Sequence, residues 1–136
     1  ATTDIYTLSL HDALPIYNLK KTISSGGSAI GAFDKNNKMI GFATINKERF
    51  GVNYKYVLLD QLFVTLEYRG EGIGRKLFEL SARAAKGMYA DRIYICAGSA
   101  EETINFYFAI GCKEAVEINE KLYENDPRDI QLEYVL

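Results

Sequence analysis

Residues 59–74 read Leu59-Asp60-Gln61-Leu62-Phe63-Val64-Thr65-Leu66-Glu67-Tyr68-Arg69-Gly70-Glu71-Gly72-Ile73-Gly74, and this stretch decides the fold. Its first half ends an apolar run over residues 56–65 whose two faces are both apolar, which predicts a central strand covered on both sides. The closely spaced glycines lead into a helix with an apolar stripe at Ile73, Leu77, Leu80, Ala84 and Met88. A strand, a glycine-rich turn and a helix in this order point several backbone N–H groups and the positive end of the helix dipole at one place. We therefore predict an anion site for a phosphate or pyrophosphate. On this signal alone, a tight turn that binds nothing stays open.

The segments around this stretch predict an α+β domain with a mixed sheet. A polar turn at residues 35–38 joins two apolar runs into a hairpin. Ser99 and Glu102 are placed to cap the second helix and Gly111 to end it. The expected elements are the end of a helix before residue 27, strands at residues 28–34, 39–45, 56–65, 92–97, 113–119 and 130–136, helices at residues 73–88 and 101–110, and a turn at residues 125–129.

The composition narrows the function classes. The chain has 136 residues, a formal net charge of −2 and a single histidine, His11. A histidine pair cannot form, and a His–Cys zinc cluster or a Ser-His-Asp triad would have to use this one histidine. We therefore expect no metal site. The chain lacks the excess of basic residues that is typical of nucleic-acid binders, and no apolar run is as long as a membrane span. We therefore expect neither a nucleic acid nor a membrane as partner. Cys96 and Cys112 lie among apolar residues, which favours free buried thiols and a cytoplasmic location.

The first sixteen residues are set apart from the rest. Residues 7–16 read Thr7-Leu8-Ser9-Leu10-His11-Asp12-Ala13-Leu14-Pro15-Ile16 and resemble, residue for residue, one reading frame of a common DNA sequencing adapter. We therefore predict a non-native segment over residues 1–16 and a domain over residues 17–136. The alternative is a natural N-terminal strand followed by a proline turn. Without this segment the chain loses Asp4 and Asp12, is formally neutral and has no histidine.

The glycine turn differs from two common phosphate loops. A nucleoside triphosphatase loop continues with Gly-Lys-Ser/Thr, which is missing here, and Gly70, Gly72 and Gly74 lie at positions one, three and five instead of the one, three and six of the dinucleotide fingerprint. The stretch instead resembles the central motif of the GNAT superfamily of acyl-CoA N-acetyltransferases, Arg/Gln-x-x-Gly-x-Gly/Ala, with Arg69, Gly72 and Gly74 at its fixed positions. The second helix agrees, because residues 106–112 read Phe106-Tyr107-Phe108-Ala109-Ile110-Gly111-Cys112 and resemble the family's Tyr-x-x-x-Gly-Phe element.

The resemblance implies acetyl-CoA as co-substrate, lying across the splayed end of the central strand. Pantetheine amides would pair with backbone groups of the strand, and the pyrophosphate would lie on the N–H groups of the turn. Arg75 and Lys76 follow at once and either add charge-assisted contacts or form a solvated helix face. Glu71 departs from the basic or neutral residue expected in the loop, and Ala100 stands where the family commonly has an asparagine that contacts the cofactor. The implied cofactor-binding residues are Leu62, Phe63, Val64, Arg69, Gly70, Glu71, Gly72, Ile73, Gly74 and Arg75.

Two residues are candidates for the chemistry. By the resemblance, Tyr107 is the general acid, because a phenol can donate to the departing sulfur and is uncharged at neutral pH. The alternative is a core tyrosine. Asp60 is the candidate base, because it shares a strand face with Leu58, Leu62 and Val64, and burial there strengthens a carboxylate as a base. The alternative is a structural carboxylate, with water or another group as the base.

The expected function is the transfer of acetyl from acetyl-CoA to a primary amine of a small molecule or peptide. The resemblance implies direct transfer, so Cys96 is expected to be a packed thiol and not an acetyl carrier. An acyl-CoA-binding module without catalysis and an interaction domain without ligand stay open as alternatives, and so does a homodimer. The tail over residues 120–132 resembles a bacterial GNAT subgroup of unassigned acceptor, which implies that the N-terminal strand and most of the first two helices are missing.

Overall fold

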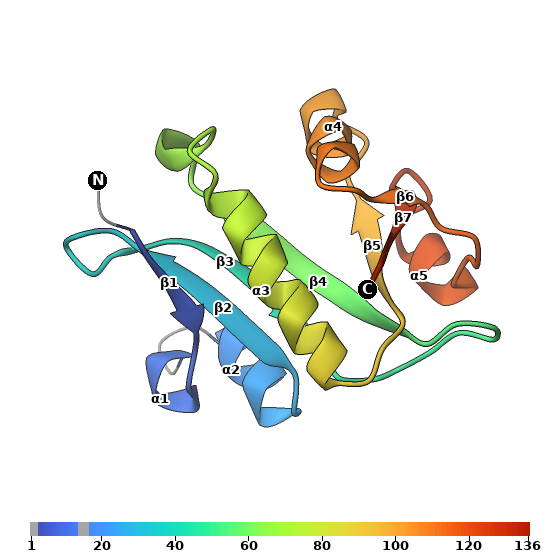
Figure 1. The fold of residues 1–136 in the computed structure, drawn as a ribbon, viewed down its shortest axis with the longest axis horizontal. Helices are drawn as coiled ribbons and strands as arrows, with labels where there is room; N and C mark the ends of the chain where they lie inside the picture. Colours follow the sequence, from blue (N-terminus) through green and yellow to red (C-terminus); the bar gives the residue numbers. More distant parts are fainter. Residues whose placement is uncertain (1–2, 14–16) are drawn as a thin grey trace.

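The computed structural model describes residues 3–13 and 17–136. In this part of the chain the strands form a seven-stranded sheet in the order β1-β2-β3-β4-β5-β7-β6, shown with its helices in Figure 1. The β4–β5 pair is parallel and the other neighbours are antiparallel, so the expected mixed, mostly antiparallel α+β sheet is confirmed. The elements are β1 (Asp4–Thr7), α1 (Leu10–Ala13), α2 (Tyr17–Ser24), β2 (Ser28–Phe33), β3 (Met39–Ile45), β4 (Tyr56–Val64), a 3-10 turn (Leu66–Tyr68), α3 (Ile73–Gly87), β5 (Arg92–Ala97), α4 (Glu101–Ala109), β6 (Lys113–Glu114), α5 (Glu120–Asn125) and β7 (Ile130–Val135).

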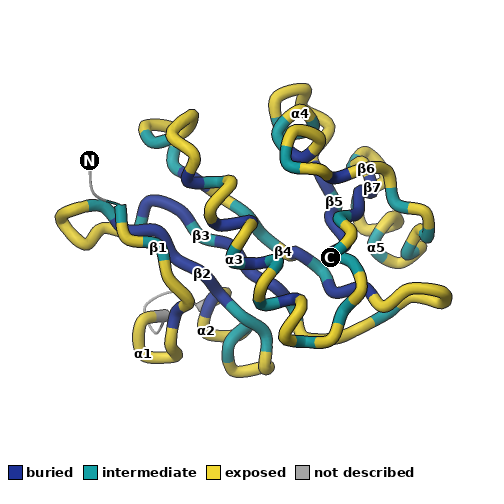
Figure 2. Tube along the Cα trace, in the orientation of Figure 1, coloured by how far each residue is buried: buried dark blue, intermediate teal, exposed yellow. Residues whose placement is uncertain are grey.

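The sheet is covered on both faces by helices. Successive residues of a strand point to opposite faces, and in β2 Ile30 belongs to the large apolar cluster that includes Leu77 of α3, whereas Ala29 belongs to a smaller cluster with Leu19 of α2. The two helices therefore lie on opposite faces. Figure 2 shows the buried residues along the central strands, with the exposed residues on the outer sides of the helices and in the loops.

A β-bulge interrupts β4 at Asp60. Thr44 of β3 pairs with Gln61, but the next residue, Ile45, pairs with Leu59. Asp60 is thus an extra residue in β4 without a partner in β3, and such a residue locally bends its strand and changes the direction of the side chains around it.

The bulge overturns the expected division of β4 into two faces. Beyond it the alternation is reversed, so Leu62 and Val64 pack with Val57 and Leu59 in the cluster beneath α3. Asp60 does not share their surroundings and is exposed. The expectation that Asp60 is buried among apolar neighbours is therefore wrong.

The helix α3 forms where the glycine turn ends, but its buried stripe differs from the predicted one. The fully buried positions are Ile73, Leu77, Phe78, Ser81 and Ala85, whereas the other three expected positions are only half-buried. The stripe is centred one position further along the chain, and it tolerates a serine because the Ser81 hydroxyl donates to the Leu77 carbonyl at 2.8 Å.

The C-terminal part contains a helix where none was expected. α5 begins after Asn119, whose side-chain oxygen accepts from the Leu122 N–H at 3.1 Å. The strand expected over residues 113–119 is confined to two residues, Lys113 and Glu114. At α4 the N-cap position is Ala100, without a side-chain hydrogen bond among the described residues, so the expected cap at Ser99 is also wrong.

The N-terminal part of the described chain contains a strand that was expected to be missing. β1 pairs with β2 from Asp4↔Phe33 to Thr7↔Ile30. The helices before β2 are short, and α2 is the helix end expected before residue 27. Leu8 is buried, and its N–H donates to the Ala29 carbonyl at 2.8 Å. Residues 4–7 therefore extend the sheet by a strand.

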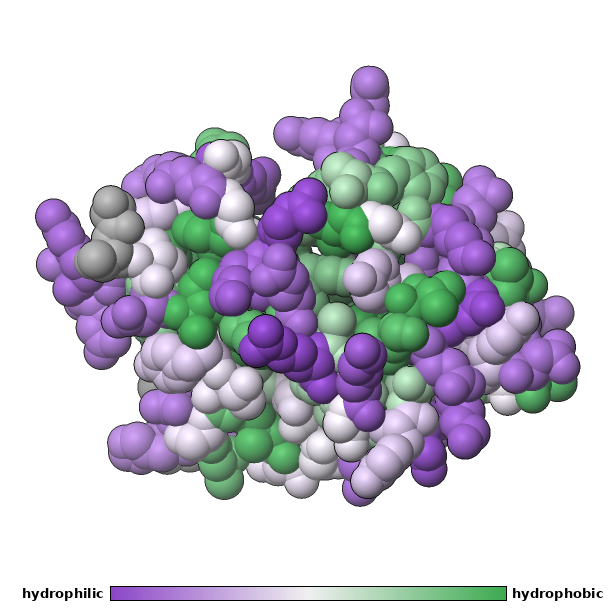
Figure 3. Space-filling view, in the orientation of Figure 1, coloured by the Kyte–Doolittle hydropathy of each residue, from purple (hydrophilic) through white to green (hydrophobic). Residues whose placement is uncertain are grey.

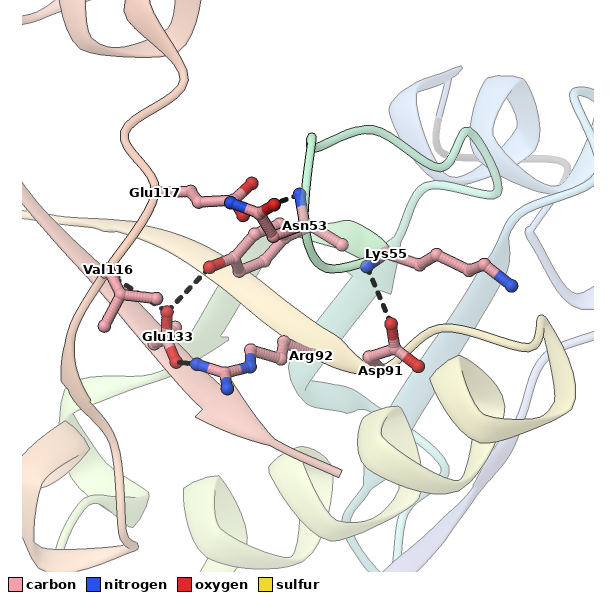
Figure 4. Close-up of polar contacts among 8 residues, drawn as sticks. Asn53, Lys55, Asp91, Arg92, Val116, Glu117 and Glu133 are labelled. Atoms are coloured by element: carbon pink, nitrogen blue, oxygen red, sulfur yellow. Dashed lines mark hydrogen bonds and ion pairs between the residues drawn. The ribbon is translucent and has the colours of Figure 1, made fainter.

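A buried polar network joins β4, β5 and β7 at the end of the sheet where β4 begins (Figure 4). Glu133 is fully buried and accepts from the Tyr56 hydroxyl at 2.7 Å, from the Val116 N–H at 2.9 Å and from the Arg92 guanidinium. Burial opposes the charge on Glu133, but these three hydrogen bonds and the positive charge of Arg92 outweigh it and lower the pKa of Glu133 below 4.5. Arg92 also stacks on the ring of Tyr54, with 3.6 Å between the guanidinium carbon and the ring centroid.

Candidate functional site

The candidate site begins where β4 and β5 separate. The two strands pair from Tyr56↔Arg92 to Leu59↔Ile95, and β4 then continues to Val64 without a partner on that side. A cavity of about 470 Å³ lies beyond this point, between the end of β4, the glycine turn and α4. Figure 3 shows the surface hollowed in this region. The cavity is lined by Leu62, Phe63, Val64, Tyr68, Arg69, Gly70, Gly72, Ile73, Gly74, Arg75, Glu102, Thr103, Phe106, Tyr107, Ala109 and Ile110.

The free edge of β4 offers backbone groups to the gap, but not from all three predicted residues. The Thr65 N–H donates to the Ile40 carbonyl of β3 at 2.8 Å, so Phe63, two residues earlier, also directs its backbone groups to β3. The backbone groups of Leu62 and Val64 are directed to the side that β5 leaves open. Pairing of a ligand amide with Phe63 through its backbone is therefore not available in this register.

Two glycines of the turn are required by backbone conformation. Gly70 and Gly72 both have φ of +84°, a left-handed conformation that disfavours any side chain. A Cβ at either position would meet no atom within 4 Å, so the space beside them is open. Gly74 matters for a different reason, because a Cβ there would lie 3.1 Å from the ring of Phe106 in α4, which would have to shift by a few tenths of an ångström. The turn is thus shaped for close approach from outside and for tight packing against α4.

The motif arginine shapes the loop. Its Nε donates to the Val64 carbonyl at 2.9 Å, and its guanidinium carbon lies 6.0 Å from the ring centroid of Phe63. Arg69 therefore ties the glycine turn back to the end of β4. This bond also occupies the Val64 carbonyl, which leaves the Val64 N–H as the free group of that residue.

The first turn of α3 has the features of an anion site. Its N-cap is Gly72, which makes no side-chain hydrogen bond, and the first turn contains no acidic residue. The N–H groups there are free of side-chain partners among the described residues, and the helix dipole adds positive potential. Arg75 lines the cavity, whereas Lys76 lies 3.7 Å from Glu79 in an exposed ion pair and does not line it. Glu71 is exposed and lies outside the lining.

Tyr107 lies in the same cavity. It is 7% exposed, and its ring packs edge-on against Phe106 and Phe78, with centroid distances of 5.2 and 6.4 Å. Burial raises the pKa of Tyr107 to about 12, with a smaller contribution from Cys112. The phenol therefore keeps its proton at every pH near neutrality.

Asp60 lies outside the cavity that contains Tyr107. It lines a second cavity, beside α2, together with Gln61. The structure thus brings Tyr107 and nine of the ten predicted cofactor-binding residues together in one cavity, all except Glu71, and leaves Asp60 outside it.

The cysteines are free thiols, as the sequence predicts. Cys112 is buried, and burial raises its pKa to about 12. Cys96 is half-buried, its Sγ lies 3.6 Å from the side-chain oxygen of Gln131, and burial raises its pKa to about 11. A thiol with a raised pKa is a poor nucleophile at neutral pH.

In the described residues no group of three or more His, Cys, Asp or Glu side chains is arranged to hold a metal ion. None of the described helices is long and apolar enough to cross a membrane.

Several lining residues were not predicted as site residues. Tyr68 precedes the motif arginine, and Glu102, Thr103, Phe106, Ala109 and Ile110 come from α4 or follow it directly. Thr103 and Ile110 lie four and three residues from Tyr107, and this spacing, which places residues on a shared helix face, could have found them. It does not mark Glu102, Phe106 or Ala109. The resemblance drew attention to the tyrosine alone.

Comparisons with known proteins agree with this geometry. A sequence profile described as Acetyltransferase (GNAT) family matches residues 3–111, which include the glycine turn and Tyr107. A search of curated protein sequences finds no match to the chain.

Solved structures share the fold at low sequence identity. A GNAT-family acetyltransferase from Staphylococcus aureus Mu50 is 20% identical with a TM-score of 0.71, and 99% of each chain is covered. The PaiA N-acetyltransferase from Thermoplasma acidophilum, in complex with coenzyme A, is 17% identical with a TM-score of 0.71 and full coverage of both chains. A GNAT-family acetyltransferase from Elizabethkingia anophelis with acetyl-CoA bound is 16% identical with a TM-score of 0.68 and 98% coverage of each chain. With the profile spanning most of its length and these structures sharing its fold, the chain belongs to the GNAT family of acetyltransferases.

Proposed function

We propose that this protein is an acetyl-CoA-dependent N-acetyltransferase that moves the acetyl group directly to a primary amine of a small molecule or peptide. The observation that carries the proposal is a single cavity that holds the open edge of β4, the glycine turn and the protonated phenol of Tyr107. These are the groups that would bind the two ends of acetyl-CoA and assist departure of its sulfur.

The residues of the cavity fit acetyl-CoA from end to end. The free backbone groups of Leu62 and the N–H of Val64 are suited to the pantetheine amides, which need a strand edge as partner. The N–H groups of the turn and of the first turn of α3, with Arg75, are suited to the pyrophosphate. Glu71 lies outside the lining and so does not place its charge within the cavity wall.

Tyr107 is proposed to act on the departing sulfur. As the amine nitrogen bonds to the carbonyl carbon, the carbon–sulfur bond breaks and negative charge gathers on sulfur. An ordinary thiol has a pKa of about 8.5, so full proton transfer from a phenol at about 12 is uphill by about 5 kcal/mol. We therefore infer that Tyr107 donates a hydrogen bond that stabilises the developing thiolate, which then takes up the proton released by the amine.

Asp60 keeps a proposed role on the acceptor side. Because it is exposed, the burial that would strengthen it as a base is absent, and water is available beside it to accept the amine proton. We infer that its carboxylate attracts and orients the amine at the border of the two cavities. The cytoplasmic location, the homodimer and the non-native origin of residues 1–16 remain predictions from the sequence.

The proposal is tested by calorimetry with acetyl-CoA followed by a thiol-release assay against a panel of primary amines. We expect heat of binding and acceptor-dependent release of CoA. A folded protein that gives no heat with acetyl-CoA would contradict any ligand-based function. Binding without release for any amine would instead support an acyl-CoA-binding module.

A further inference from the structure

A second cavity borders the first along β4. It has a volume of about 950 Å³ and lies between α2, the segment after β3 and the bulge of β4. Consecutive residues of β4 line the two cavities, Asp60 and Gln61 the second, and Leu62, Phe63 and Val64 the first. The two cavities are therefore adjacent along β4, next to the bulge.

The second cavity has a distinct charge pattern. Three cations, Lys21, Lys47 and Arg49, line it together with two acids, Glu48 and Asp60. None of the three cations forms an ion pair within 4.0 Å in the part of the chain that the structure describes. Their charge is therefore available to a ligand, and the cavity combines it with the carboxylate of Asp60, next to the residues of β4 that line the first cavity.

A structural role for the lysines is not needed at this end of α2. The carbonyls of Lys21, Thr22 and Ile23 already accept from the N–H groups of the residues that follow the helix, at 2.9–3.0 Å. The exposed side chain of Lys47 lies beside Gly26, because its Cδ and Nζ are 2.7 and 3.3 Å from where a Cβ of Gly26 would be. This places the ammonium next to the end of α2.

Resting on the proposed function, we propose that this cavity is the acceptor site and that it selects amines that also carry an anionic group, a carboxylate or a phosphate. The amine would lie beside Asp60 at the bulge, and the anionic group would lie among Lys21, Lys47 and Arg49. Opposite charges at the two ends orient the acceptor, so its nitrogen is turned toward the cavity that contains Tyr107.

The test uses acceptors that differ only in the anionic group. β-Alanine is compared with propylamine, and phosphoethanolamine with ethanolamine, by acceptor-dependent release of CoA. We expect the anionic member of each pair to have the higher kcat/KM, and the two pairs distinguish a carboxylate from a phosphate. A higher kcat/KM for the neutral member of both pairs would overturn the proposal.

Variants assign the preference to the cavity. In the double variant Lys47→Ala and Arg49→Ala, we expect KM for the anionic acceptor to rise about 10-fold, from roughly 2- to 5-fold for each exposed charge, with kcat and acetyl-CoA binding unchanged. The matched control is Lys35→Ala with Lys38→Ala, two exposed lysines of the β2–β3 turn outside the cavity. An unchanged ratio between paired acceptors in the cavity variant would contradict the assignment.

Binding without turnover separates this proposal from the proposed function. If no amine releases CoA, the acetyltransferase proposal fails, and NMR titration with phosphoethanolamine alone decides the acceptor-site proposal. Shifts at residues 18–27 and 46–49 that are lost in the double variant would support an anionic-amine site. The absence of shifts there would overturn it.

Discussion

At the scale of single residues, Tyr107 has the most specific proposed task. Tyr107 is buried and keeps its proton, and no hydrogen bond of its hydroxyl is found among the described residues. Tyr107→Phe removes the donor and keeps the ring contacts with Phe78 and Phe106. We expect kcat to fall about 100-fold with little change in the dissociation constant of acetyl-CoA, measured by CoA release and by calorimetry.

The control for this variant is a neighbouring aromatic residue on the same helix. Phe108 is 46% exposed and does not line the cavity, so Phe108→Leu should leave kcat unchanged. A Tyr107→Phe variant that matches wild-type kcat would rule out the hydrogen bond to sulfur and leave Tyr107 as a core residue.

Gly72 is the second residue with a specific consequence. An alanine there meets no atom within 4 Å, but its φ of +84° is costly for a side chain. We expect Gly72→Ala to lower the free energy of unfolding by about 1 kcal/mol and to weaken acetyl-CoA binding about 10-fold, because the turn relaxes away from the ligand. Calorimetry and urea unfolding measure both effects.

Gly87 provides the matched glycine control. It lies in the last turn of the same helix, without a positive φ and with open space around its Cα. Gly87→Ala should stabilise the protein by about 0.5–1 kcal/mol and leave acetyl-CoA binding unchanged. Equal binding by the Gly72→Ala and Gly87→Ala variants would show that the left-handed turn is not part of the site.

At the scale of elements, Glu133 joins three strands through one carboxylate. It accepts from Tyr56 of β4, Arg92 of β5 and the backbone after β6. Glu133→Gln leaves the Arg92 charge without a partner, and we expect the free energy of unfolding at pH 7 to fall by about 3 kcal/mol. Urea unfolding measures this loss, with Glu114→Gln, an exposed neighbour in β6, as the control. Coincident unfolding curves for the two variants would contradict the role of the network.

The elements differ in how far local sequence predicts them. β4, the glycine turn and α3 follow from apolar runs and residue types that need no information from elsewhere in the chain. The bulge at Asp60 depends on pairing with β3, since Leu59 and Gln61 oppose adjacent residues there. Simple alternation along the strand therefore predicted a buried Asp60, and pairing made it exposed.

At the scale of the whole molecule, the free energy of unfolding should fall at acid pH and at alkaline pH. On the acid side, the pKa of Glu133 is lowered in the folded state, so its contribution is present above the ordinary value near 4.5 and is lost as pH falls through the folded value. On the alkaline side, burial raises the pKa of Cys112 to about 12, so stability is lost as pH rises above 9.0, the ordinary value of the thiol.

Urea unfolding between pH 3 and pH 11 should therefore give a plateau that falls below about pH 4.5 and above about pH 9. Glu133→Gln should flatten the fall in stability at acid pH. Cys112→Ala should reduce the fall at alkaline pH without removing it, because the raised pKa values of Cys96 and Tyr107 also contribute there. A fall in stability that is unchanged in these variants would assign the pH dependence to other groups.

The N-terminal segment is expected to contribute to the stability of the whole molecule. β1 extends the sheet, and Leu8 is 4% exposed in the cluster with Leu19 and Ala29. We expect removal of residues 1–16 to lower the free energy of unfolding by about 2 kcal/mol, from the exposure of this cluster. Urea unfolding of the shortened chain measures the loss. Equal stability would show that the segment adds nothing to the fold and would favour its predicted non-native origin.

By itself, the sequence determined the strand, glycine turn and helix that form the cofactor side of the candidate site, because glycine spacing and apolar periodicity act locally. It also indicated Tyr107 through its distance from Gly111. Only the tertiary structure decided which backbone groups of β4 are free, where Asp60 lies and which cations share its cavity. These depend on the register between strands and on segments that are distant in sequence, and no local pattern records them.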